Sequence, residues 1–182
     1  MKTSKTKSIV LIALFVALIT AGAFIKIPIP MVPFTLQTLF TMLAGLLLGK
    51  KNGTIAVCVY IFLGLAGLPV FAHGGGIGYI FQPSFGYIIG FAVGAYVTGA
   101  IANKTADPSY LRLLAAGLAG LAIVYIFGLI YFYFMSNLYL GNNITVRVLL
   151  IHCFLLTIPG DIVCCVFGAS LAKRLRKVLA LY

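Results

Sequence analysis

Charged side chains, and acidic ones above all, are scarce in this chain. Of its 182 residues 8% are charged, and only two are Asp or Glu. Charged residues make up about a quarter of an ordinary soluble domain. A protein with so few charges is therefore not expected to fold as a soluble globular domain.

Motifs for enzymatic chemistry are also missing. The segment 45–51 reads GLLLGKK and lacks both the spacing and the hydroxyl of a phosphate-binding loop. With two acids, two histidines and no His-Glu-x-x-His, the chain has no pattern of a metal enzyme. A general acid–base pair would have to join Asp161 to His73 or His152, and no motif supports such a pair. We therefore expect a protein that is not an enzyme and that has no metal site and no cofactor.

The cysteines do not form a disulfide or zinc pattern. They are Cys58, Cys153, Cys164 and Cys165, and all of them lie in apolar runs. A disulfide framework or a zinc site needs a different spacing and more polar surroundings. We interpret them as small apolar residues in helix packing.

Long apolar runs make up most of what the sequence does contain. Hydrophobic residues account for 63% of the chain, and a transmembrane helix needs about 20 such residues in succession. The pattern predicts an all-α integral membrane protein, with one domain over residues 1–182 and six transmembrane helices in the lipid bilayer. Their expected positions are 9–25, 35–49, 54–70, 84–103, 111–135 and 147–172. Asn52-Gly53 is the expected turn between the second helix and the third.

Basic residues give the chain a formal net charge of +11. They occur in short clusters between the apolar runs, which is typical of the positive-inside rule and not of a face that binds nucleic acid. With the N-terminus inside, the inner segments hold Lys2, Lys5, Lys7, Lys50, Lys51, Lys104, Arg112, Lys173, Arg174, Arg176 and Lys177. Only Lys26 and Arg147 are left for the outside. We therefore expect both termini in the cytoplasm, and we expect the run 9–25 to be a transmembrane helix rather than a signal peptide.

Asp161 is the one acidic residue inside an apolar run. A carboxylate at bilayer depth costs about 3 kcal/mol on insertion scales, so such a group usually faces a cavity and binds something. Pro159 and Gly160 precede it, and we expect them to break the helix and to expose backbone polar groups. This predicts a polar binding spot in the outer third of the membrane. The alternative is that an internal partner such as Arg147 or Gln37 satisfies Asp161.

Two of the outer loops have unusual compositions. The loop 26–34 contains three prolines, which forbid a helix and favour a stiff extended path that lies over the protein like a lid. The loop 71–83 has four glycines within positions 74–78, so its backbone could approach a ligand closely. A flexible linker is the alternative for the second loop.

Polar and aromatic residues mark the outer ends of two expected helices. Gln37 offers a donor and an acceptor to a small polar ligand, while Thr35 beside it is a candidate either for the ligand or for a helix cap. Tyr87 starts the helix 84–103, where it would line a pocket or belong to an interfacial belt of aromatic residues.

Small residues form two stripes at helical spacing. Ala13, Ala17 and Ala21 share one face of the first helix, and Gly86, Gly90, Gly94 and Thr98 share one face of the fourth. Such stripes allow helices to approach closely. Each stripe could serve packing inside the bundle or docking to a partner subunit in the membrane.

Several motifs together resemble the BioY family. They are Ile29-Pro30-Met31-Val32-Pro33-Phe34-Thr35-Leu36-Gln37-Thr38-Leu39, Leu43 to Gly49, Gly67-Leu68-Pro69-Val70-Phe71-Ala72, Pro83-Ser84-Phe85-Gly86-Tyr87 and Pro159-Gly160-Asp161. The family comprises the biotin-specific substrate-binding components of energy-coupling factor transporters in prokaryotic cell membranes. The resemblance implies six helices, biotin bound at the outer side, and association with a transmembrane coupling protein and two ATP-hydrolysing subunits.

The resemblance also implies roles for single residues. The ligand-contacting aspartate of the family matches Asp161, its glycine-rich loop matches His73 to Gly76, and its docking motif matches Ala13-x-x-x-Ala17. Some members carry basic residues where this chain has Ile88 and Cys164, so His73, Gln37 or the loop amides would hold a ligand carboxylate here. The expected biotin site comprises Thr35, Gln37, His73, Gly74, Gly75, Phe85, Tyr87, Asp161 and Cys164, and the expected docking face comprises Ala13, Ala17 and Ala21.

A second function is compatible with a lone carboxylate in the membrane. Asp161 could be the proton site of a self-sufficient, proton-coupled vitamin carrier. The internal repeat that is common in such carriers is not visible in the sequence. We therefore expect the transporter subunit, which needs partners to hydrolyse ATP.

Overall fold

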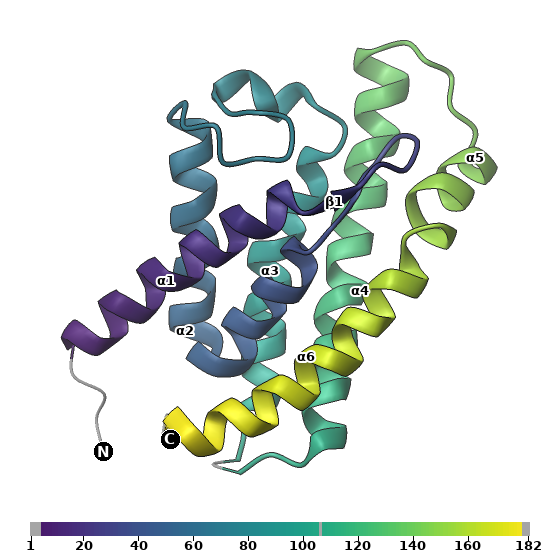
Figure 1. The fold of residues 1–182 in the computed structure, drawn as a ribbon. Coiled ribbons are helices and arrows are strands. Elements are labelled where there is room, and N and C mark those ends of the chain that lie inside the picture. Colours follow the sequence, from purple (N-terminus) through teal and green to yellow (C-terminus); the bar gives the residue numbers. More distant parts are fainter. Residues whose placement is uncertain (1–4, 106, 180–182) are drawn as a thin grey trace.

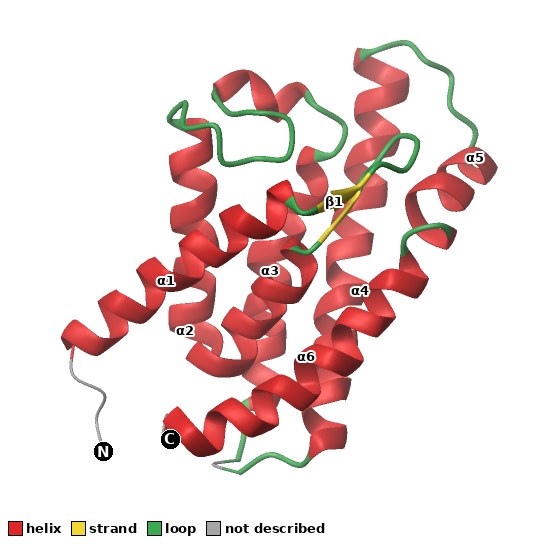
Figure 2. Cartoon of the chain, in the orientation of Figure 1, coloured by secondary structure: helices red, strands yellow, loops and turns green. Residues whose placement is uncertain are grey.

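The computed structural model describes residues 5–105 and 107–179, and they form a bundle of helices (Figure 1 and Figure 2). The helices are α1 (Lys5–Phe24), α2 (Gln37–Leu65), α3 (Phe85–Ala102), α4 (Tyr110–Phe134), α5 (Val146–Leu150) and α6 (Ile158–Leu179). A 3-10 turn, η1 (Ile77–Phe81), precedes α3, and π-helical turns η2 (Met135–Tyr139) and η3 (Ile151–Leu155) follow α4 and α5. Two short strands, β1 (Lys26–Ile27) and β2 (Phe34–Thr35), pair in antiparallel fashion.

The helices confirm the all-α membrane class but not the count of six. Among the described residues, five helical stretches are long and apolar enough to cross a membrane. They are Lys5–Phe24, Gln37–Leu65, Phe85–Ala102, Tyr110–Tyr139 and Val146–Lys177. α2 covers most of both the expected second span (35–49) and the expected third span (54–70), and each of these spans is shorter than the about 20 residues that a crossing needs.

α2 is a helical hairpin and not a straight rod. Gly49 has φ 79° and ψ 176°, a conformation that interrupts the helix and that residues with a Cβ rarely adopt. Beyond it the chain turns back on itself. A close contact shows this reversal: a Cβ on Gly53 would lie only 2.6 Å from the carbonyl oxygen of Ala44. In a continuous helix these residues would be about 13 Å apart. The expected turn at Asn52-Gly53 was therefore misplaced: Gly49 makes the reversal and Gly53 lets the arms touch.

The glycine stripe of α3 packs inside the bundle, as one of its two interpretations predicted. A Cβ on Gly90 would lie 2.8 Å from the Cα of Val124, and one on Gly94 would lie 2.9 Å from the carbonyl oxygen of Gly120. Thr98 extends the stripe and donates a hydrogen bond to the carbonyl oxygen of Ala116 (3.2 Å). Through these contacts the backbones of α3 and α4 pack directly against each other. They fix the relative position of the two helices, both of which contribute residues to the cavity described below.

The alanine stripe of α1 faces outward. Ala13, Ala17 and Ala21 are exposed, whereas Phe15 and Ile19 on the other side of the helix are buried. Internal packing is therefore the wrong interpretation of this stripe within the chain.

The last apolar run does not form one continuous helix. α5 and η3 are followed by a turn at residues 156–157, and α6 begins at Ile158. The expected break at Pro159-Gly160 is therefore wrong, because both residues lie in the first turn of α6. Proline is tolerated there since the missing N–H group would have no helical partner in any case. Asp161 follows in the same turn and donates its backbone N–H to the carbonyl oxygen of Thr157 (3.2 Å).

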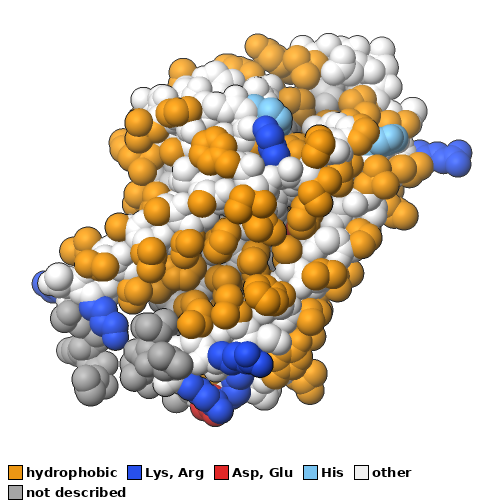
Figure 3. Space-filling view, viewed as in Figure 1, with side chains coloured by type: hydrophobic (Ala, Val, Ile, Leu, Met, Phe, Trp, Pro, Cys, Tyr) orange, Lys and Arg blue, Asp and Glu red, His pale blue; other side chains and the backbone are white. Residues whose placement is uncertain are grey.

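Basic side chains gather at one end of the molecule. The first turn of α1 and the last turns of α6 lie at this end in Figure 1, and Figure 3 shows blue side chains there below an apolar belt. Arg176 joins the end of α6 to the α2 hairpin through the carbonyl oxygen of Leu46 (2.7 Å) and to Asn103 (2.6 Å). Lys2 lies outside the described residues. That this basic end faces the cytoplasm stays a prediction.

Candidate substrate-binding site

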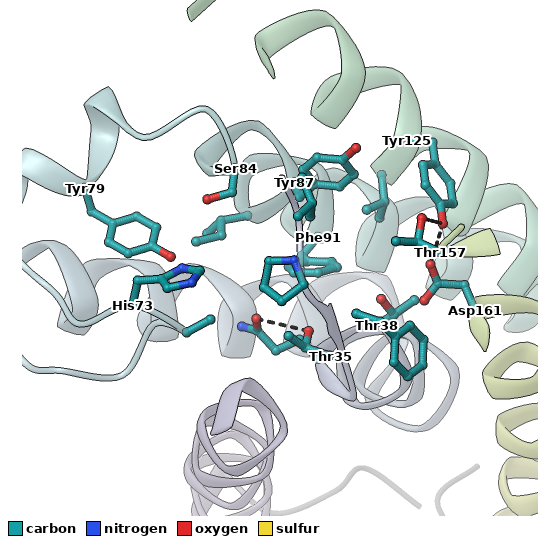
Figure 4. A pocket seen from close by; sticks show the side chains of 17 residues that line it. Thr35, Thr38, His73, Tyr79, Ser84, Tyr87, Phe91, Tyr125, Thr157 and Asp161 are labelled. Carbon is teal, nitrogen blue, oxygen red and sulfur yellow. Dashed lines mark hydrogen bonds between the residues drawn. The ribbon is translucent and has the colours of Figure 1, made fainter. Parts of the chain in front are cut away.

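A cavity opens between the loops at the other end of the molecule and reaches into the bundle (Figure 4). Its empty volume is about 600 Å³, including the space at its mouth, which is in the range of small-molecule sites. The lining residues are Val32, Pro33, Phe34, Thr35, Gln37, Thr38, Ala72, His73, Tyr79, Ser84, Tyr87, Ile88, Phe91, Val124, Tyr125, Thr157 and Asp161. They come from the lid loop and β2, the start of α2, the glycine-rich loop, α3, α4, the turn before α6 and α6 itself.

The inner end of the cavity is built around Asp161, which is only 6% exposed. Its Oδ2 accepts a hydrogen bond from the hydroxyl of Tyr125 (2.5 Å), and that hydroxyl also lies 2.8 Å from Oγ1 of Thr157. Its Oδ1 is buried and has no hydrogen-bond partner among the described residues. Buried polar atoms nearly always have a partner, so this oxygen can accept a hydrogen bond from a ligand. The side chain of Thr38 lies beside the same carboxylate (Figure 4) and interacts with it. The first turn of α6 favours a negative charge at this point.

Neither of the two residues named as a possible internal partner of Asp161 bonds to it. Gln37 instead donates from Nε2 to the hydroxyl of Tyr60 (2.6 Å), and its Oε1 accepts from Thr35 (3.4 Å). Arg147 is exposed at the start of α5. Asp161 does have an internal partner, but this partner is Tyr125 of α4, and it bonds only to Oδ2.

The opposite end of the cavity is formed by His73, Tyr79 and Ser84 (Figure 4). Partial desolvation, followed by the positive charge of Lys26, lowers the pKa of His73 below its ordinary value of 6.5. The imidazole is therefore mainly neutral at pH 7. Burial also raises the pKa of Tyr79, so its hydroxyl stays protonated.

The glycine-rich loop is packed, so the linker interpretation is wrong. The backbone N–H of Gly76 donates to the carbonyl oxygen of Gly64 (2.7 Å), and Phe71 and Gly74 exchange backbone hydrogen bonds (2.9 and 3.2 Å). A Cβ on Gly75 would collide with the carbonyl oxygen of Leu68. The loop is thus a fixed wall that presents Ala72 and His73 to the cavity.

The lid loop, residues 26–34, contains no helix, as its prolines predicted, but it does not follow the expected extended path: it bends back at residues 30–32, where Met31 has φ 72°, and forms a hairpin over the cavity. Its ends are tied by the β1–β2 pair, in which Lys26 faces Thr35 and Ile27 faces Phe34. Val32, Pro33 and Phe34 line the cavity. Phe34 also packs on α6, since a Cβ on Gly160 would lie 2.7 Å from its ring.

The side walls are aromatic. The rings of Tyr87 and Tyr125 meet edge to face with centroids 6.1 Å apart. The hydroxyl of Tyr87 donates to the carbonyl oxygen of Cys153 (3.0 Å), which anchors the ring in the cavity wall. Together with Phe91 these rings give an apolar middle between two polar ends.

The structure gathers only part of the expected site. Thr35, Gln37, His73, Tyr87 and Asp161 line one cavity. Gly74, Gly75, Phe85 and Cys164 do not line it. Phe85 packs against Tyr79 and Tyr131 with ring centroids 6.4 and 6.0 Å apart, and Cys164 is buried in the bundle.

Sequence reasoning missed several residues of the cavity. Tyr125 and Thr157 contact or adjoin Asp161, and Thr38 and Ser84 add hydroxyls to the wall. The available signal was that a hydroxyl inside an apolar span tends to face protein and not lipid. No group of three or more His, Cys, Asp or Glu that could hold a metal occurs in the part of the chain that the structure describes.

Comparisons with known proteins agree with this architecture. The sequence model of the BioY family matches residues 1–181. A probable biotin transporter BioY of Lysinibacillus sphaericus is 44% identical over 178 residues, which cover 98% of this chain and 91% of that protein. The biotin transporter BioY of Thermotoga maritima is 42% identical over 166 residues, which cover 91% of this chain and 93% of that protein.

A solved structure has the same fold. It is the crystal structure of the S-component for biotin from an ECF-type ABC transporter, and it superposes with a TM-score of 0.85 at 33% sequence identity. The match covers 97% of this chain and 94% of that chain. Family model, relatives and structure therefore agree over nearly the whole length, and the chain belongs to the BioY family.

Proposed function

We propose that this protein is the substrate-binding component of an energy-coupling factor importer and that it binds biotin in the cavity beneath the lid loop. The observation that carries the proposal is the cavity itself, with the buried Oδ1 of Asp161 left without a hydrogen-bond partner at its inner end. The family and its biotin transporters support biotin as the ligand.

The chemistry of biotin suits the three zones of the cavity. The ureido group has two N–H donors, and the free Oδ1 of Asp161 is an acceptor for one of them. The apolar ring and the aliphatic chain fit against Tyr87 and Phe91 in the middle. The carboxylate is then directed to the end formed by His73 and Tyr79.

The proposed membrane arrangement follows from the fold and the charges. The two arms of α2 add a sixth helical segment to five membrane-crossing stretches, both termini lie in the cytoplasm, and the cavity opens outside the cell membrane. The alanine face of α1 (Ala13, Ala17 and Ala21) is exposed and smooth, so it suits docking to a transmembrane coupling protein. Two ATP-hydrolysing subunits bound to that protein would drive inward delivery.

Calorimetric titration of biotin into the purified chain in detergent tests the proposal. We expect saturable binding of one biotin per chain with no partner present. A folded protein that binds no biotin would contradict the proposal. Uptake by the chain alone that stops when the proton gradient is collapsed would favour a proton-coupled carrier instead.

A further inference from the structure

We propose that Lys26 binds the ligand's carboxylate at the mouth of the cavity and so fixes the direction in which the ligand lies. The inference rests on the proposed function, because it concerns an acidic ligand in the same cavity. It assigns a specificity-determining role to a residue outside the cavity lining.

The first observation is that the cavity lining lacks the positive charge that would balance the carboxylate of an acidic ligand. Among the residues that the structure describes, its lining includes no Lys or Arg, and Asp161 at the inner end adds a negative charge. His73 is the one basic side chain in the lining, and its lowered pKa leaves it mainly neutral at pH 7. An acidic ligand would therefore enter a site without positive charge unless a neighbouring residue supplied it.

The second observation is that Lys26 is held at the mouth. Its Nζ donates to the carbonyl oxygen of Ala72 (2.9 Å), which belongs to the cavity lining next to His73. Its backbone is fixed by the β1–β2 pair, directly opposite the lining residue Thr35. Figure 3 shows a Lys or Arg side chain beside a His on this face, away from the basic end.

The third observation is that Lys26 has donors to spare. An ammonium group has three N–H donors, and the bond to Ala72 uses one of them. The other two have no partner among the described residues, so they can meet a carboxylate without breaking the contact between the lid loop and the glycine-rich loop. Arg147, the other basic residue expected on this side, does not line the cavity.

These positions give the ligand a direction. Figure 4 shows His73 and Tyr79 at one end of the cavity and Tyr125, Thr157 and Asp161 at the other. A ligand with N–H donors at its head and an acid at its tail would place its head at Asp161 and its tail at Lys26. The site would therefore prefer the acid to a neutral derivative of the same molecule.

The test compares biotin with biotinamide, in which a neutral amide replaces the carboxylate. Calorimetry on the wild type and on Lys26→Ala, Lys26→Arg and Arg147→Ala should show that Lys26→Ala weakens biotin binding about tenfold, the loss of one exposed charged hydrogen bond. Biotinamide should bind the wild type and Lys26→Ala equally. Lys26→Arg should keep most of the affinity for biotin, and Arg147→Ala should keep all of it.

Two results would overturn the inference while the proposed function survives. Unchanged biotin affinity in Lys26→Ala would remove its role in binding, and equal losses for biotin and biotinamide would show that Lys26 only ties the two loops together. If the folded wild type bound neither compound, the proposed function itself would fail and this inference with it.

Discussion

At the scale of single residues, Asp161 is the one acidic side chain in the cavity lining as the structure describes it, and its two carboxylate oxygens have different surroundings. Its carboxylate is buried among apolar helices, and one oxygen is satisfied by Tyr125 while the other has no partner among the described residues. Leaving a buried acceptor unsatisfied costs about 1–3 kcal/mol, which the fold tolerates because a ligand can supply the missing donor. One oxygen is therefore satisfied within the protein, and the other is available to the proposed ligand.

Replacing Asp161 by asparagine should weaken biotin binding by about 1–3 kcal/mol, the value of a lost charged hydrogen bond. The dissociation constant from calorimetry should rise about 5- to 150-fold. Asp107→Asn is the matched control, since Asp107 is exposed and pairs with Lys173 (2.6 Å) away from the cavity. If a folded Asp161→Asn protein bound biotin with unchanged affinity, Asp161 would not contribute to ligand binding.

Replacing Tyr125 by phenylalanine should lower the stability of the ligand-free protein. Oδ2 of Asp161 would lose the donor that now satisfies it, at a cost of about 1–3 kcal/mol. Thermal unfolding in detergent measures the change, and Tyr110→Phe, whose hydroxyl makes a longer and exposed bond (3.4 Å), is the control. If the two variants melt alike, the bond between Tyr125 and Asp161 does not stabilise the protein.

At the scale of the elements, close backbone contacts replace the hydrophobic effect as the organising force. Lipid is as apolar as the side chains, so helices associate by close packing and hydrogen bonds. α3 and α4 approach through Gly90, Gly94 and Gly120, and the α2 arms approach through Gly53. The positions of the cavity-lining residues on α3 and α4 therefore depend on these contacts.

Substituting Gly90 by alanine should destabilise the protein by about 1–3 kcal/mol, the usual cost of overpacking. The new Cβ would meet the backbone of Val124 at 2.8 Å, and backbone cannot move aside as a flexible side chain can. Thermal unfolding should show the loss for Gly90→Ala and none for Gly78→Ala, because the site of Gly78 is open. Equal melting temperatures would mean that α3 and α4 separate at little cost.

At the scale of the whole molecule, the proposed binding cavity and the proposed docking face lie apart. The cavity opens among the loops at one end, and the exposed alanine face runs along α1 on the outside of the bundle. A change on that face should therefore affect the partner and not the ligand.

A tryptophan in place of Ala17 should leave biotin affinity unchanged and block uptake in cells that contain the coupling module. The bulky ring would hold a partner helix away from the smooth face of α1. Ile126→Trp, at a side chain that is 51% exposed on α4, is the control and should support normal uptake. Normal uptake with Ala17→Trp would argue against docking at this face.

Much of the architecture could be predicted from the sequence because its causes are local. Runs of apolar residues must be helical in a bilayer, which set the membrane class and placed α1, α3 and α4 within a few residues. The cost of a charge in lipid singled out Asp161 as the residue to examine. The prolines of the lid loop excluded a helix there, although they did not predict the turn at residues 30–32.

The tertiary structure alone decided which residues meet. Tyr125 reaches Asp161 across 36 positions of sequence, and no local pattern distinguishes it from the other tyrosines of α4. Apolar periodicity could not tell the buried glycine stripe of α3 from the exposed alanine stripe of α1, because in a membrane both the lipid-facing and the protein-facing sides of a helix are apolar. The reversal at Gly49 and the place of Lys26 at the cavity mouth likewise depend on contacts between segments that are distant in sequence, and only the folded chain brings those segments together.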